Sequence, residues 1–360
     1  MKKIMALLLL LLVTAISPTN LFAQEESLPK VSEDSFQAEI TGYKNYDCFE
    51  GATCTDFILK TAEGEEIIIT ITPEEQAVVE IREYEVGDKV IVISNTYGEE
   101  TTYFITDHVR SNYIYLLAVI FILIVIVVGK VKGISSLLGL TFSIFVLFLF
   151  ILPSILNGGN PLLIGIIGSL AIAIPSIYLS HGFNQKSTIA LIGTMASLVI
   201  IFSLSILFTN LMKLTGFSSE EAMFLQGENF SLNMKGILLA SIVFGGIGLL
   251  DDVTVSQVSV TKELNEATKK MSSNELFRKA MNVGQDHISS MVNTLFLAYA
   301  SSSLPLVLLL RQQDAPFREI LNNEIIAEEI LRTIIGSIGL VLAVPITTVL
   351  AVYFFKKKNN

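Results

Sequence analysis

The chain has 360 residues, of which 51% are apolar and 16% are charged, and its formal net charge is −10. Soluble domains of this length carry about a quarter charged residues, so this composition excludes an ordinary soluble protein. It predicts a membrane protein that crosses the bilayer several times.

The first 23 residues have the layout of a secretory signal peptide. Lys2 and Lys3 precede an apolar segment from Ile4 to Val13, and the small residue Ala23 ends the region. Such a segment is normally removed during export. We therefore predict that the mature chain begins outside the cytoplasm; an uncleaved anchor is the alternative, because the cleavage rule is met at one of its two positions.

Residues 24–112 form an acidic segment without an apolar run long enough to span a membrane. This segment contains 20 acidic and 6 basic residues, a formal net charge of −14. Five short β-rich runs alternate with turn residues: Phe36 to Tyr43, Thr55 to Lys60, Glu66 to Thr72, Lys89 to Ser94 and Thr101 to Thr106. This pattern predicts an extracytoplasmic domain that is a small β-barrel or β-sandwich of the OB or SH3 kind.

Both cysteines of the chain, Cys48 and Cys54, lie in this acidic domain. An exported domain is in a compartment that permits oxidation, where closely spaced cysteines pair more often than they bind a metal or act as a redox couple. We predict a disulfide that closes a loop, and no metal site.

Hydropathy predicts about seven transmembrane helices between residues 113 and 358, because about twenty apolar residues cross ~30 Å of hydrocarbon. The predicted spans are 113–129, 134–152, 162–179, 187–212, 236–261, 286–310 and 333–355. If the acidic domain lies outside, the inner segments carry eleven basic residues against five in the outer loops. This bias predicts a multi-pass protein of a bacterial plasma membrane with a cytoplasmic C-terminus.

The loops between the spans are too short for a nucleotide-binding domain. The largest inner loop runs from Lys262 to Gln285, and the chain has no G-x-x-x-x-G-K-[ST] phosphate loop. Ser272 and Glu275 have the spacing of a capping box, and Gly284 can end a helix, so we predict a short helix in this loop. No cofactor and no enzymatic activity are expected.

Carboxylates inside two neighbouring spans need an explanation, because a charged side chain in hydrocarbon costs a few kcal/mol. If the fifth and sixth spans pack antiparallel, Asp252, Ser256, Asn293 and Thr294 reach one level in the inner leaflet, with Asp286 at its mouth. One interpretation is a site that coordinates a cation or relays protons during transport. Another is a structural hydrogen-bond network that holds the two helices in register.

A third interpretation, an intramembrane aspartyl protease, does not fit the spacing. Those enzymes have an aspartate directly after the second glycine of G-x-G-D, whereas Leu249 and Leu250 separate Gly248 from Asp251.

Charged residues outside the predicted cluster have simpler explanations. Helical spacing relates Glu324, Glu328 and Arg332, which favours a salt-bridged surface over a cation-binding vestibule. His181 and His287 are assigned an interfacial role at the inner ends of spans.

Several motifs resemble the YibE/F-like family of bacterial membrane proteins. They are D-V at Asp252, E-L at Glu263, N-V-G-Q-D-H-I-S-S-M-V-N-T-L-F-L-A-Y-A-S-S-S-L-P-L from Asn282, and E-I-I-A-E-E-I-L-R-T-I-I-G-S-I-G-L-V-L-A-V-P from Glu324. The resemblance implies that the family's polar positions fall on Asp252, Asp286, Asn293, Thr294 and Tyr299. Asp251 departs from the family pattern, since an apolar residue is usual there. The resemblance does not assign a biochemical activity to the chain, because the family has no securely established one.

These observations predict a secondary transporter or a permease component that uses the polar cluster of the fifth and sixth spans. The alternative is a non-transporting assembly or signalling component whose exported domain binds a partner in the envelope. The expected partners are the lipid bilayer and a small solute or ion, and not nucleic acid. A homo-oligomer and a paralogous partner subunit both stay open.

Overall fold

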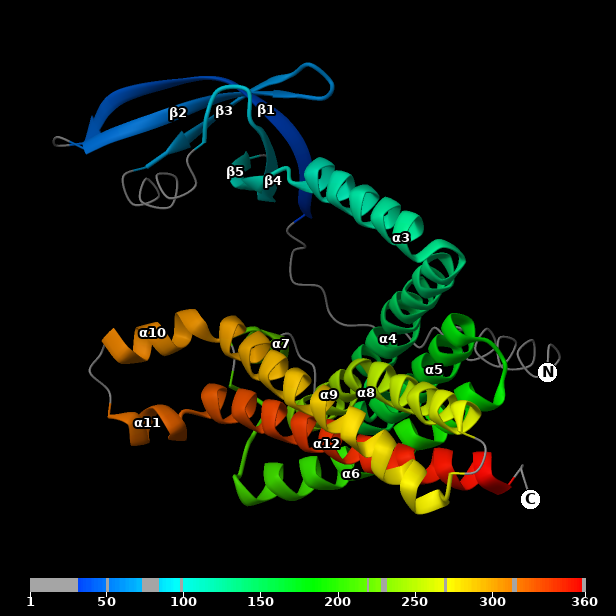
Figure 1. The fold of residues 1–360 in the computed structure, drawn as a ribbon. Helices are drawn as coiled ribbons and strands as arrows, with labels where there is room; N and C mark the ends of the chain where they lie inside the picture. Colours follow the sequence, from blue (N-terminus) through cyan, green and yellow to red (C-terminus); the bar gives the residue numbers. More distant parts are fainter. Residues whose placement is uncertain are drawn as a thin grey trace. The chain divides into compact units, whose positions relative to one another are not determined.

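The computed structural model describes residues 32–49, 52–72, 84–97, 100–218, 220–227, 232–268, 271–312 and 316–357 (Figure 1). The predicted signal peptide, residues 1–23, lies outside the described residues. The chain divides into two compact units whose boundary falls between Ile124 and Val125, and each unit is described by itself.

An antiparallel sheet of five strands forms most of the described part of the N-terminal unit, which also includes the start of the first helix. The strands are β1 (Ser32–Phe49), β2 (Ala52–Thr61), β3 (Glu66–Ile71), β4 (Lys89–Tyr97) and β5 (Glu100–His108). Each overlaps one of the predicted β-rich runs, and the long β1 pairs with β2 through one part of its length and with β4 through another. Inward-facing side chains of Ile40, Leu59, Val90 and Val92 are fully buried, which gives the sheet its core.

The strands follow the order β3-β2-β1-β4-β5, and in the described ranges no ladder of hydrogen bonds joins the edge strands β3 and β5. The sheet is therefore open, and the predicted barrel is not confirmed. Near the tip of the β1–β2 hairpin, a disulfide joins Cys48 and Cys54, whose Cα atoms are 5.7 Å apart. The disulfide lies next to the cross-strand pair Asp47 and Thr53 and closes this end of the hairpin.

Helices make up the rest of the described chain. They are α3 (Ser111–Val146), the π-helix η1 (Leu147–Ile151), α4 (Leu152–Leu156), α5 (Pro161–His181), α6 (Gln185–Leu211), α7 (Glu220–Gly227), α8 (Met234–Ala267), α9 (Ser273–Ser302), α10 (Leu304–Gln312), α11 (Phe317–Asn322) and α12 (Glu324–Lys357). Several begin at a side chain that accepts a backbone N–H of the first turn: Asn160 for α5, Asn184 for α6, Asn233 for α8 and Ser272 for α9.

Among the described residues, five helices are long and apolar enough to cross a membrane, and the pair α9 and α10, bent by 59°, is a candidate sixth. The first of the five continues through η1 and α4, from Ser111 to Leu156. Inside it, Lys130 has φ 50° and ψ −132°, which separates two helical stretches at the predicted first inner loop. The chain is thus a multi-pass membrane protein, while the count of seven spans stays a prediction.

The predicted helix of the largest inner loop is longer than its sequence suggests. It starts where expected, since the Ser272 hydroxyl accepts the Glu275 N–H, but it does not end at Gly284. Helix α9 continues to Ser302, so the prediction of a glycine stop was wrong. The physical reason is close packing: a Cβ on Gly284 would lie 2.4 Å from Val344 Cγ1, so glycine admits α12 rather than ending the helix.

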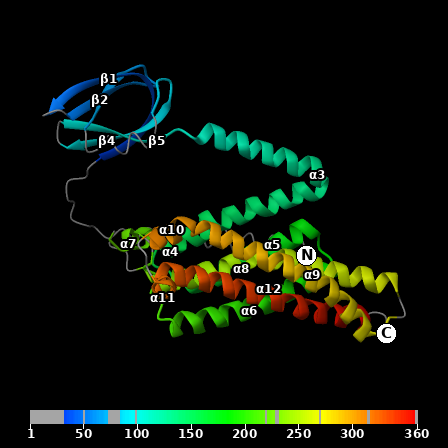
Figure 2. The same ribbon diagram turned by 60° about the vertical axis from the view of Figure 1, so that its left-hand side comes forward.

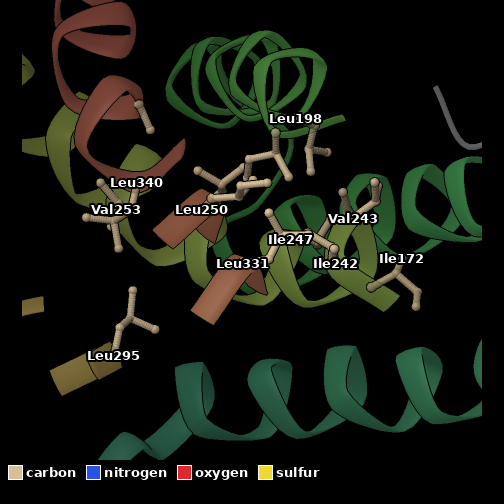
Figure 3. Packing of buried hydrophobic residues seen from close by; sticks show 14 of the residues in the cluster. Ile172, Leu198, Ile242, Val243, Ile247, Leu250, Val253, Leu295, Leu331 and Leu340 are labelled. Carbon is tan, nitrogen blue, oxygen red and sulfur yellow. The ribbon is translucent and has the colours of Figure 1, made fainter. Parts of the chain in front are cut away.

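Helix α8 is central to the bundle, where it packs against α5, α6, α9 and α12 (Figures 1 and 2). Its buried residues Ile242, Ile247, Leu250 and Val253 contribute to one continuous apolar core (Figure 3). Leu250 is fully buried in that core. Because α8 contacts four helices, its rotation decides which of its polar side chains can reach a cavity.

Glycine lets α5 approach α8 closely. A Cβ on Gly165 would lie 2.7 Å from Ala240 Cβ and 3.0 Å from Ala240 Cα. A side chain at position 165 would therefore push α5 away from α8. Membrane helices pack most closely where small residues face each other, as Gly165 and Ala240 do here.

We expect Gly165→Ala to lower the stability of the helical unit, because the added methyl overlaps α8 at a cost of about 1–3 kcal/mol. Thermal unfolding of the full chain in nanodiscs measures the effect. Gly248→Ala is the matched control, since nothing lies within 4 Å of its new Cβ and alanine favours the helix. Equal unfolding temperatures for the two variants would contradict the packing argument.

Candidate functional site

A cavity of about 680 Å³ lies among α3, α5 and α8. Its lining combines carboxylates, hydroxyls, one lysine and one histidine with apolar side chains. The lining residues are Lys132, Ser136, Leu140, Ser143, Ile172, Ser176, Ser180, His181, Phe244, Gly245, Ile247, Gly248, Asp251 and Asp252.

Helical spacing explains why α8 brings two carboxylates and two glycines to this cavity. Gly245, Gly248, Asp251 and Asp252 follow one another at intervals of three, three and one residues, which places them on one face of α8. The opposite face, with Leu250, belongs to the apolar core. The glycines leave space in front of the carboxylates, since no atom lies within 4 Å of a Cβ on Gly248.

Asp251 has one hydrogen-bond donor in the cavity. The Ser176 hydroxyl of α5 donates to Asp251 Oδ2 over 3.1 Å, while the buried Oδ1 has no partner among the described residues. Asp252 is exposed to the cavity, and within the described ranges neither carboxylate takes part in a salt bridge. The cavity therefore contains negative charge that the bundle does not neutralise by direct pairing.

Hydroxyl groups face these carboxylates from α3 and α5. Ser176 and Ser180 are one turn apart on α5, and a Cβ on Gly139 of α3 would lie 3.4 Å from Ser180 Oγ. Ser136 and Ser143 are two turns apart on α3. Oxygen ligands at these positions suit a hard cation or a protonated solute.

The polar residues predicted to meet between α8 and α9 are not gathered at one place. Asp251 and Asp252 line the cavity, and the Tyr299 hydroxyl reaches to 3.8 Å from a Cβ on Gly245. The side chains of the remaining predicted residues are exposed and do not line the cavity: Ser256, Asp286, Asn293 and Thr294. In the described ranges, no hydrogen bond joins Asp252 to Asn293.

A different side chain joins α8 to α9. The amide of Gln257, only 4% exposed, donates to the Ala280 carbonyl over 2.9 Å and to Thr348 Oγ1 over 2.7 Å. It thereby links α8, α9 and α12 in the bundle interior. This hydrogen-bond network begins five residues after Asp252 and includes neither Asp252 nor Asn293, the residues for which the sequence suggested a structural network.

A second charged cluster lies at the start of α12. Arg332 forms a salt bridge there, but in the described ranges its partner is Glu329 and not Glu324 or Glu328, which share its helical spacing. The Glu324 carboxylate accepts hydrogen bonds from the Thr215 hydroxyl and from the N–H groups of Thr215 and Gly216. Glu328 is 7% exposed and accepts the Ser218 hydroxyl, while Arg332 pairs with Glu329. These carboxylates hold the loop after α6 against α12, because backbone donors in that loop need acceptors.

The contribution of α3 and α5 to the cavity was not among the predictions from the sequence. The signal was present: Ser176 and Ser180 recur at i and i+4 in an apolar span, directly before His181. His181, which was assigned an interfacial role, lines the cavity and is close enough to Asp252 for electrostatic interaction. No group of three or more His, Cys, Asp or Glu side chains with metal-binding geometry occurs in the described ranges.

Comparison with known proteins identifies one family. The protein-family model described as YibE/F-like protein matches residues 117–357, which include every residue that lines the cavity. No curated protein and no solved structure matches the chain.

A cysteine that replaces Asp252 is expected to react with a charged, water-soluble thiol reagent, because the cavity is polar and Asp252 is exposed to it. Val199→Cys is the control, since Val199 is 63% exposed on the apolar surface of α6 and a thiol there faces lipid. Both native cysteines are in a disulfide, so they add no background. Equal labelling rates of the two variants would show that the cavity is dry.

Replacement of Glu324 by alanine is expected to release the loop from Met212 to Ser218. The loop loses the acceptor of three hydrogen bonds, worth about 1–2 kcal/mol of local stability and a roughly tenfold rise in opening. Trypsin cleavage after Lys213 in the full chain measures this opening. Glu319→Ala, on the exposed surface of α11, is the control, and equal cleavage in both variants would rule out a clamp.

Proposed function

The chain belongs to the YibE/F-like family, and we propose that it is a secondary transporter of a bacterial plasma membrane, or the permease component of one. In this proposal, the cavity among α3, α5 and α8 binds a small cation or a protonated solute. Asp251 and Asp252 are its charged ligands, and the serines of α3 and α5 complete the polar surroundings.

One observation carries the proposal: two carboxylates line a polar cavity within apolar helices, and neither has a salt-bridge partner in the described ranges. Ionisable side chains at membrane depth are expensive and commonly mark the path of an ion or a proton. Glu324 accepts three hydrogen bonds at Oε1 from a neighbouring loop. Asp251 accepts one hydroxyl and has one buried oxygen without a partner among the described residues. Glu328 shares this property, but it does not line the cavity.

The cation would bind first by electrostatic attraction and then by direct coordination. Asp252 is accessible in the cavity, whereas Asp251 is less exposed and lies against Ser176. The cation could therefore bind first to Asp252 and then to Asp251. Lys132, just after the break in α3, and His181, the last residue of α5, both line one end of the cavity. The positive charge of Lys132 would disfavour a cation at that end, and the carboxylates of Asp251 and Asp252 would offset it.

The helices around the cavity contain features that permit movement. Pro175 lies inside α5, directly before Ser176, and its missing N–H leaves the Ala171 carbonyl without the usual helical donor. Such interruptions are common where helices of transporters line a binding site. Under the charge bias of the loops, the Lys132 and His181 end of the cavity faces the cytoplasm, and the acidic β domain is extracytoplasmic.

We expect proteoliposomes that contain the full chain and internal pyranine to change internal pH when a Na⁺ or K⁺ gradient is imposed. Asp251→Asn and Asp252→Asn should each slow this change at least tenfold, because an amide cannot supply the negative charge that holds a cation. Pyranine fluorescence records the rate.

Glu266→Gln is the control, since Glu266 is an exposed partner of Lys262 outside the cavity and should leave the rate unchanged. Wild-type rates no faster than those of empty liposomes would contradict cation-coupled transport. Full cellular function of both aspartate variants would instead favour the alternative, a non-transporting assembly or signalling component.

A further inference from the structure

Helix α9 has an outward face with the spacing of a coiled-coil seam. Asp286, Ser290, Asn293, Leu297 and Ala300 recur at intervals of four, three, four and three residues, and all five are exposed. Residues with this spacing form one stripe along a helix, and in a coiled coil they contact a second helix. We refer to these five residues as the α9 seam.

Packing on the opposite side of α9 fixes the outward direction of this seam. Gly284 lies against α12 and Gln257, and Leu295 is 7% exposed in the apolar core of the bundle. Ile288 and Met291 pack against the same core. Rotation of α9 that buried Asn293 would therefore remove Gly284 and Leu295 from their contacts.

The polar side chains of the seam have no hydrogen-bond partners among the described residues, although they lie in a segment predicted to be inside the membrane. Helices α9 and α10 together are apolar enough to span a membrane, and Ser290 and Asn293 lie well inside that span. In the described ranges, the side chains of Asp286, Ser290 and Asn293 take part in no hydrogen bond or salt bridge. Hydrocarbon supplies no hydrogen bonds, so an uncovered seam is unfavourable.

The first predicted span cannot satisfy this seam. Its sequence from Tyr113 to Gly129 contains no polar side chain beyond Tyr113 and Tyr115, so it has no hydrogen-bond partner to offer Asn293 deep in the membrane. A second copy of α9 has the required groups. Asparagine and serine side chains each donate and accept hydrogen bonds, so the part of the seam from Ser290 to Ala300 is complementary to itself, whereas Asp286 at the inner end of the seam only accepts.

We propose that two copies of this chain associate through their α9 seams. Copies inserted with the same orientation are related by a two-fold axis along the membrane normal, so equal residues of the two seams meet. Asn293 then bonds to the same residue of the second copy, and the small residues Ser290 and Ala300 allow the helices to approach. Leu297 supplies apolar contact between them. This association does not depend on transport through the cavity.

Single cysteines test the geometry, because both native cysteines are in a disulfide. In membranes that contain the full chain, Asn293→Cys and Leu297→Cys are expected to form disulfide-linked dimers under copper phenanthroline. Phe296→Cys should cross-link at least fivefold less, although Phe296 and Leu297 are similarly exposed, at 61% and 58%. The two positions are about 100° apart around the helix.

Asn293→Leu provides a second test, since leucine removes the hydrogen bonds and is tolerated in lipid. Single-molecule photobleaching of the labelled full chain in nanodiscs should give two steps for the wild type and for Phe296→Leu, and mainly one for Asn293→Leu. One-step bleaching of the wild type, equal cross-linking at Phe296 and Leu297, or cross-links to a protein of another mass would each overturn the proposal.

Discussion

The buried amide of Gln257 joins three helices and helps to align them. The positions of the cavity carboxylates and of the α9 seam depend on this alignment. By donating to the Ala280 carbonyl and to Thr348 Oγ1, this side chain aligns α8 with α9 and α12. Gly284 fits directly against it. With α8 held in this way, Asp251 and Asp252 face α5 and the cavity, and with α9 held in this way, Asn293 faces outward. In lipid, a buried amide with filled hydrogen bonds specifies orientation more than apolar contact alone does.

The bundle contains carboxylates in two settings that differ in how their hydrogen-bond capacity is filled. At the start of α12, Glu324 accepts hydrogen bonds from two backbone N–H groups and one hydroxyl of a neighbouring loop, which is the setting of a structural clamp. In the cavity, Asp251 accepts one hydroxyl and retains a buried oxygen without a partner among the described residues. Glu328 also retains a buried oxygen without a partner in the described ranges, but of these two carboxylates only Asp251 lines the cavity. Because an unfilled carboxylate at membrane depth is costly, the cavity is where a ligand is expected.

Glycines serve two roles where helices meet α8. Gly165 of α5 admits Ala240 of α8, whereas Gly248 of α8 opens space in front of the carboxylates. The two roles are distinguished by what lies opposite. A Cβ on Gly165 would meet the Cβ and Cα of Ala240, and a Cβ on Gly248 would meet no atom within 4 Å.

The sequence by itself determined the elements with strong local signals. Apolar length predicted the membrane helices, alternation predicted the five strands, and Ser272 marked the start of α9 because a cap is a local interaction. The motifs also identified the family that the match over residues 117–357 supports. Tertiary structure decided what faces what: it turned Asn293 away from Asp252, brought Ser176 to Asp251 across 75 residues, and continued α9 past Gly284. These outcomes depend on helix rotation and on atoms distant in the chain, and neither is encoded by the spacing within a single span.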